Sequence, residues 1–337
     1  MVRKDAVHYP MKRKLVIAVS TFLSLCAIAP SRGPRANLLP KLQPGQTLTY
    51  LVRFRSNKNV KTESTLVIPL APTASQGDTR ALLRIQILDV QQTGGRLAVH
   101  ARSEFLGNDT GEPPSKNVPQ NQKSGQLPLK ADGKPVEFTI SAGGFAEKIT
   151  GLDALSPDRR QVWQEWLARF ATAWALPSPS AKIGDKWKID QPEPAPSPIA
   201  ALSWARDSSY VRDEPCAPAQ LSLTGEVTPA NAATDSCAVL LTTAKLVQKS
   251  SPKDATPEDF KLHQLKTMGA AKGSNETITY ISLTTGLVVR ATEDATQQMD
   301  VVIAKADGSN AVRYNVDAKS QLEVLLLTQV PQAPLPH

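Results

Sequence analysis

Hydrophobic and polar residues alternate with a period of two along most of the chain, and this pattern predicts β-strands. It is clearest in 47–55, in a hairpin formed by 81–90 and 96–106, and in 136–140. Further strands are expected at 60–70, 199–206, 237–248, 277–283, 287–294, 298–306 and 311–327. The expected fold class is therefore mainly β, an antiparallel curved sheet or half-barrel meander.

Three segments interrupt the alternation. The residues Ser56-Asn57-Lys58-Asn59 have turn chemistry, which predicts a turn between the strand at 47–55 and the next one. Residues 107–130 are rich in Gly, Pro, Asn, Gln, Ser and Lys, and we expect a mobile loop there. A short helix is expected near Pro257 to Met268.

One prominent amphipathic helix is predicted at about 157–176. Ser156 suits the N-cap and Pro157 the first helical position, and Pro177 ends the helix. One face carries a stripe of large apolar side chains, namely Trp163, Trp166, Leu167, Phe170 and Trp174. Two interpretations are open: the stripe packs on the sheet as core, or it lines a pocket for a hydrophobic ligand.

Residues 1–31 have the composition of a signal peptide. A basic start precedes the uncharged run from Leu15 to Ala29, which is shorter than the roughly 20 residues of a membrane-spanning helix. Cleavage is expected after one of residues 29–36, and Met11 is an alternative start. Cys26 is a weaker candidate for lipidation. Membrane contact is expected only if Cys26 is lipidated or the signal stays uncleaved as an anchor.

Charge and cysteine usage agree with export. The chain has a net charge of +8, but five basic side chains and one acid give residues 1–31 half of it. The small net charge of the rest of the chain gives no reason to expect nucleic-acid binding. After the signal only Cys216 and Cys237 remain, and an exported pair is most simply a disulfide, with two unpaired thiols as the alternative. No histidine lies at ligand spacing from either, so no metal site is expected.

Catalytic motifs are not evident, so the chain is expected not to be an enzyme and to need no cofactor. His100, His263 and His337 belong to no metal-binding motif, and no serine-hydrolase elbow or phosphate loop occurs. Glu293 and Asp294 are adjacent on a predicted strand, so their side chains point to opposite faces. Surface solvation is the expected role of both.

A short signature follows the predicted helix, formed by Leu176, Pro177, Gly184, Asp185 and Trp187. With Pro44-Gly45 before the first strand and Thr285-Gly286 before a late one, it resembles uncharacterised secreted bacterial all-β proteins. That resemblance implies an architecture and no activity. At the level of fold alone, the layout is also similar to periplasmic lipoprotein carriers of the LolA/LppX type, in which helices cover the apolar cavity of a half-barrel.

These observations predict a single β-rich domain at 37–330 and a disordered tail at 331–337. The expected location is the periplasm or the extracellular space. The expected function is non-enzymatic binding of a lipid, another hydrophobic small molecule or an envelope protein in the curved sheet. The alternative is a structural or interaction module with a fully packed core, and an enzyme of unrecognised type is the third and least favoured hypothesis.

Overall fold

The computed structural model describes a defined part of the chain. The described residues are 35–64, 73–93, 95–107, 131–192, 197–221, 227–228, 233 and 235–328. All of them belong to the second of the two units into which the chain divides, Pro34–His337. The predicted signal peptide with Cys26, nearly all of the predicted loop at 107–130, and the tail at 331–337 lie outside the described residues.

One antiparallel sheet of 11 strands dominates the structure, and it confirms the expected fold class. In spatial order its strands are β6 (Ala146–Thr150), β5 (Ala131–Ile140), β4 (Arg96–Leu106), β3 (Thr73–Thr93), β2 (Thr47–Ser64), β15 (Val312–Leu326), β14 (Val288–Lys305), β13 (Leu265–Ser282), β12 (Asp235–Gln248), β9 (Leu202–Cys216) and β8 (Lys186–Pro192). The sheet is open, with β6 and β8 at its two edges. Two pairs of short strands lie apart from it, β1 (Ala36–Asn37) with β7 (Ser180–Ala181) and β10 (Gln220–Leu221) with β11 (Val227–Thr228).

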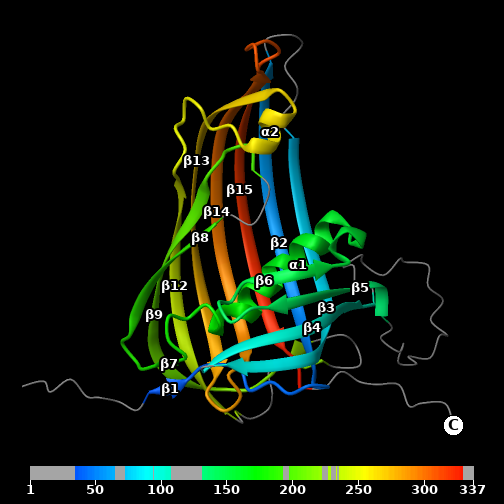
Figure 1. The fold of residues 1–337 in the computed structure, drawn as a ribbon, viewed down its shortest axis with the longest axis vertical. Coiled ribbons are helices and arrows are strands. Elements are labelled where there is room, and N and C mark those ends of the chain that lie inside the picture. The colour runs from blue at the N-terminus through cyan, green and yellow to red at the C-terminus, as the bar shows by residue number, and fades with distance from the viewer. Residues whose placement is uncertain are drawn as a thin grey trace, which may run out of the picture. The chain divides into compact units, whose positions relative to one another are not determined.

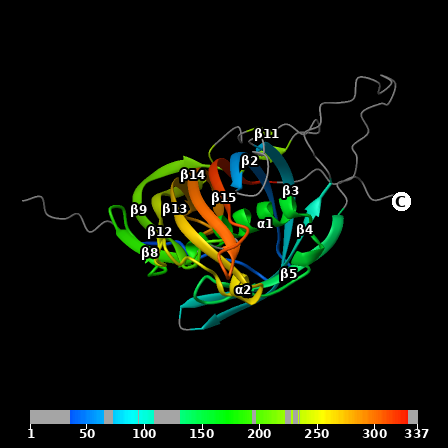
Figure 2. The ribbon, with the colours of Figure 1, turned by 90° about the horizontal axis from the view of Figure 1, so that it is seen from above.

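The predicted helix is α1 (Pro157–Phe170), and the sheet curves around it (Figures 1 and 2). The Ser156 hydroxyl accepts a hydrogen bond from the Arg159 backbone N–H, as an N-cap should. A 3₁₀ turn, η2 (Ala171–Ala173), continues the helix, so the helical segment ends three residues before the predicted boundary at 176. The other helical elements are η1 (Leu152–Ala154) and α2 (Glu258–Leu262). Because β13 already begins at Leu265, α2 is shorter than the predicted segment.

The predicted turn at residues 56–59 is wrong. Strand β2 continues through these residues to Ser64 and pairs along its length with β15 on one side and β3 on the other. Backbone hydrogen bonds to two neighbouring strands override the local turn preference of Ser and Asn. For the same reason the segments predicted as separate strands at 287–294 and 298–306 form the single strand β14.

Alternation along the strands gives the sheet an inner face, which α1 covers in part, and an outer face. On β2 the even-numbered residues such as Tyr50 and Phe54 face inward, and Arg53 and Arg55 face outward. The outer side chains form cross-strand ion pairs, for example Arg53 with Glu323 on β15 at 3.2 Å. Residues in register across the strands therefore form rows on the inner face, which differ in chemistry from one end of the strands to the other.

The expected disulfide between Cys216 and Cys237 is present, with a Cα–Cα distance of 5.8 Å. It joins the end of β9 to the start of β12, which are neighbours in the sheet. A disulfide is compatible with an exported protein, because such bonds persist in oxidising compartments.

Candidate functional site

A cavity of about 1060 Å³ lies on the inner face of the sheet, beside α1. Its wall is formed mainly by residues of β2, β3, β14 and β15, and a few residues of β8, β9, β13 and the segment before β9 complete it. The polar side of α1 borders it through Gln161, Gln164, Glu165 and Arg169. The helix therefore separates two environments: its aromatic side faces the packed core and its polar side faces the cavity.

Strand register divides the cavity wall into bands. Next to the row of Phe54 and Glu293, which α1 contacts through Arg169, lies a row of small and polar residues that we call the polar row: Gly77, Ser56, Ser320, Ala295 and Asn275. Two rows further along the strands, away from the aromatic core, lies an apolar row: Val60, Val316, Met299 and Ala271. Tyr314, Val301 and Ile303 continue this apolar surface beyond it.

Apolar side chains on this wall are incompletely covered by the described part of the chain. Val60, Met299, Ile303, Tyr314 and Val316 are all half-buried, although they lie on the inner face of the sheet. Contiguous apolar surface that remains accessible is uncommon in soluble proteins outside binding sites. These side chains are therefore suited to contact the apolar part of a ligand.

Two small residues lie on the cavity side of the sheet, and one of them accommodates Trp204. The row between the polar and apolar rows holds Ala318 and Gly273, and a Cβ atom on Gly273 would come within 3.1 Å of the Trp204 ring. The indole of Trp204 thus lies directly over β13 and contributes to a second buried cluster with Leu246 and Val301. Gly273 therefore makes room for the Trp204 ring, and that ring forms part of the cavity wall.

A buried ion pair joins α1 to the sheet at the edge of the cavity. The Arg169 side chain, 4% exposed, contacts Glu293 of β14 at 2.5 Å and Glu165 at 3.4 Å. The Thr277 hydroxyl donates a hydrogen bond of 2.6 Å to the same Glu293 carboxylate. Glu293 and Asp294 do point to opposite faces, but the expected solvation of Glu293 is wrong, because its side chain is only 10% exposed.

The aromatic stripe of α1 lies in the packed core and not along the cavity. Trp163, Trp166, Phe170 and Trp174 are all buried, and Leu167 packs against them in a half-buried position. Trp166 stacks on Phe170 with ring centroids 4.9 Å apart, and Phe138 of β5 meets Trp163 edge-on at 5.4 Å. For this face of the helix, the geometry favours the packed-core interpretation over the pocket.

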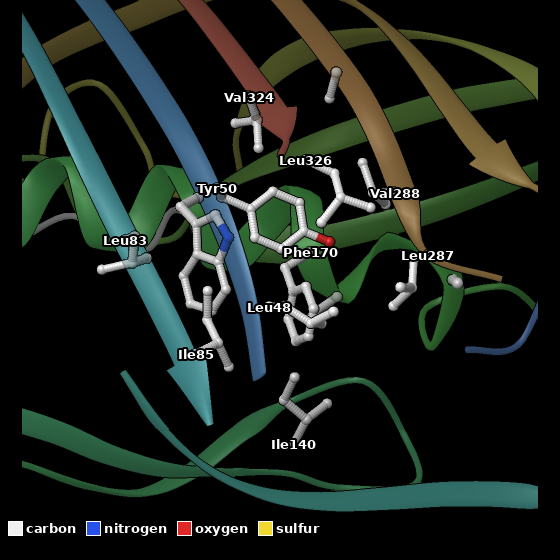
Figure 3. Close-up of a cluster of buried hydrophobic side chains, with 14 of the residues drawn as sticks. Leu48, Tyr50, Leu83, Ile85, Ile140, Phe170, Leu287, Val288, Val324 and Leu326 are labelled. Atoms are coloured by element: carbon white, nitrogen blue, oxygen red, sulfur yellow. The ribbon is translucent and has the colours of Figure 1, made fainter. Parts of the chain in front are cut away.

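Tyr50 of β2 lies at the centre of this core. Figure 3 shows its ring beside Phe170, with Val324 and Leu326 of β15 close by. Burial raises the pKa of the Tyr50 phenol, because the ionised form would lose its hydration. Its hydroxyl has no hydrogen-bond partner among the described residues. A phenol held neutral in an apolar core is unsuited to acid–base chemistry near neutral pH.

The signature residues after α1 build a turn. Asp185 accepts a hydrogen bond from the Lys182 backbone N–H at 3.0 Å, and Gly184 takes the positive φ of 91° that glycine tolerates best. Leu176 and Trp187 are half-buried against the main core, while Pro177 is exposed. These residues position the chain between α1 and the edge strand β8, and they do not line the cavity.

Metal and catalytic sites are not evident in the described residues. No group of three or more His, Cys, Asp or Glu side chains in this part of the chain is arranged to hold a metal ion. His100 and His263 are both exposed. Nor does any helix among the described segments have the length and apolar character needed to cross a membrane.

A second hollow, of about 900 Å³, is lined by six strands from β3 to β12. The side chains that reach it from the outer face are mostly charged or polar, and several already pair with each other. Arg55 contacts Asp78 at 3.2 Å and Gln321 donates to Asp294 at 2.8 Å. Because these polar groups already pair with each other and are not available to a ligand, the inner cavity is the better candidate site.

Comparisons with known proteins do not place the chain in a family. No family model and no curated protein sequence matches it. A crystal structure of Pseudomonas aeruginosa OccK7 (OpdD) aligns over 84% of this chain and 100% of its own, with 6% sequence identity and a TM-score of 0.12. At that TM-score the likeness supports no statement about fold or function.

Proposed function

We propose that this protein is an exported, non-enzymatic binding protein that holds an amphipathic small molecule in the cavity beside α1. One observation carries the proposal: a cavity of about 1060 Å³ with a half-buried apolar wall on one side and polar side chains on the other. Sites for small ligands have volumes of roughly 300–1,000 Å³ and combine apolar lining with a few polar groups. The curved sheet with a helix on its inner face is also the layout implied by the resemblance to lipoprotein carriers.

Export is supported by the sequence of residues 1–31 and by the disulfide. We expect the mature protein in the periplasm or the extracellular space, with a tether only if Cys26 carries a lipid. Burial of apolar ligand surface contributes about 25 cal/mol per Å², so contact with the apolar wall would favour binding of a lipid-sized ligand.

Native mass spectrometry of the unreduced protein, purified from its own host, tests both parts of the proposal. We expect a polypeptide that begins after one of residues 29–36, together with extra mass that leaves on denaturation. A full-length polypeptide would contradict cleavage of the signal. A bare polypeptide mass would instead favour the alternative, an interaction module that binds a protein partner.

Filling the cavity should weaken ligand binding without unfolding the protein. Gln297 of β14 lines the cavity, whereas its neighbour Gln298 is exposed on the outer face. We expect Gln297→Trp to weaken binding of the neutral apolar probe N-phenyl-1-naphthylamine by at least about tenfold, since each 1.4 kcal/mol lost is a factor of ten. Fluorescence titration of the probe provides the measurement.

Gln298→Trp is the matched control, because it adds the same ring to the opposite face of the same strand. Its probe affinity should equal that of the wild type, and circular dichroism should show an unchanged fold in both variants. Equal affinities of the two variants for the probe would place the binding site elsewhere and refute the cavity as the site.

A further inference from the structure

Lys58 is a basic residue on the inner face of β2. It follows Phe54 and Ser56 in the inward-facing alternation, precedes Val60, and belongs to the cavity lining. In the register of the sheet it lies opposite Ser75 on β3 and Ala318 on β15. Neither neighbour carries a charge that could neutralise its ammonium group.

Two of the other cations around the cavity already form ion pairs. Arg169 pairs with Glu165 and Glu293, and Arg160 lies 3.9 Å from Asp153. The ammonium group of Lys58, in contrast, forms no ion pair or hydrogen bond with the rest of the described chain. The lining as a whole contains five basic residues and three acidic ones: Lys58, Arg160, Arg169, Arg206 and Lys319 against Asp158, Glu165 and Glu293. Since two of the three acids pair with Arg169, the cavity has positive charge to offer.

Lys58 places a positive charge next to the apolar wall of the cavity. Its row lies between the polar row, which provides the Ser56 and Ser320 hydroxyls, and the apolar row with Val60 and Val316. Adjacent inward-facing residues of a strand are about 7 Å apart, so a lysine side chain reaches groups in either row. A ligand with a charged head at Lys58 could therefore place an apolar chain along Val316 and beyond it.

We propose that the ligand is an anionic amphiphile, in which a carboxylate or phosphate group binds Lys58 and the Ser56 hydroxyl while the apolar chain lies on the wall formed by Val60, Met299, Ile303, Tyr314 and Val316. This inference rests on the proposed function and deepens it by naming the chemical class of the ligand. The ammonium group supplies a charge-assisted hydrogen bond, which is stronger than a neutral one.

The test compares two probes with the same dansyl group and alkyl chain, the negatively charged 11-(dansylamino)undecanoic acid and its neutral methyl ester. We expect the wild type to bind the acid about fivefold more tightly than the ester, the range of a solvent-accessible ion pair. Lys58→Gln should remove that preference by weakening the acid alone. The matched control Lys61→Gln, an exposed residue of the outer face on the same strand, should retain it.

The outcomes separate this inference from the proposed function. Binding of the ester without any preference for the acid, or a preference that survives Lys58→Gln, overturns the role of Lys58 and leaves the cavity as the binding site. Failure to bind either probe refutes both. Competition then identifies the head group: displacement by oleate indicates a carboxylate, displacement by lysophosphatidate indicates a phosphate, and displacement by neither overturns the inference.

Discussion

Replacing Arg169 by methionine is expected to lower the free energy of unfolding by about 3–5 kcal/mol, because it leaves the Glu293 carboxylate buried without its counter-ion. The Arg169 and Glu293 side chains are 4% and 10% exposed. Methionine retains an apolar chain similar to the methylene groups of arginine. The decrease in the free energy of unfolding therefore reflects the lost charge more than lost packing. Urea denaturation at pH 7, followed by circular dichroism, measures the change.

A second substitution shows whether the unpaired Glu293 carboxylate, and not a general disruption of the fold, causes the loss of stability. Arg169→Met combined with Glu293→Gln removes both charges and keeps an oxygen that can accept the Thr277 hydroxyl. We expect this double variant to recover most of the lost stability. Arg160→Met on the same helix, whose side chain is 40% exposed, should cost less than about 0.5 kcal/mol. A double variant as unstable as Arg169→Met alone would contradict the role of the buried charge.

Local patterns in the sequence were sufficient for the fold class and for α1. Period-two alternation identifies the strands, and Ser156, Pro157 and the spacing of the aromatic residues define the helix. The same patterns failed where a strand gains two neighbours. Ser56 to Asn59 read locally as a turn, but ladder hydrogen bonds to β3 and β15 hold them extended. Such pairing involves other parts of the chain and cannot be inferred from the local sequence pattern.

The candidate site was only partly predictable. The sequence drew attention to the aromatic stripe, which the structure places in the packed core, because large aromatic residues are informative about burial and not about what they bury against. The alternating Met299, Val301 and Ile303 were visible in the sequence as one face of a strand. The residues that lie beside this face in one row, namely Lys58, Ala318 and Gly273, are set by strand register. The partner of Glu293 was likewise hidden, since Arg169 is 124 residues away in sequence.

Truncating Trp166 to alanine should lower the free energy of unfolding by about 3–5 kcal/mol, the range for removing a large aromatic side chain from a core. Trp166 is fully buried and has ring contacts with Tyr50, Phe138, Trp163 and Phe170. The resulting cavity borders Tyr50 of β2, Phe138 of β5 and two rings of α1 itself, so a cavity term adds to the loss of buried apolar surface. Urea denaturation by circular dichroism gives the change in stability.

Trp166→Phe distinguishes a residue of the core from a residue that contacts ligand. The smaller ring keeps most of the packing and removes an indole N–H that has no hydrogen-bond partner among the described residues, so we expect a loss below about 2 kcal/mol. Because Trp166 lies on the side of α1 that faces away from the cavity, affinity for N-phenyl-1-naphthylamine should not change in this folded variant. A clear loss of probe affinity with stability retained would restore the aromatic stripe as the ligand-binding surface and count against the cavity on the other side of the helix.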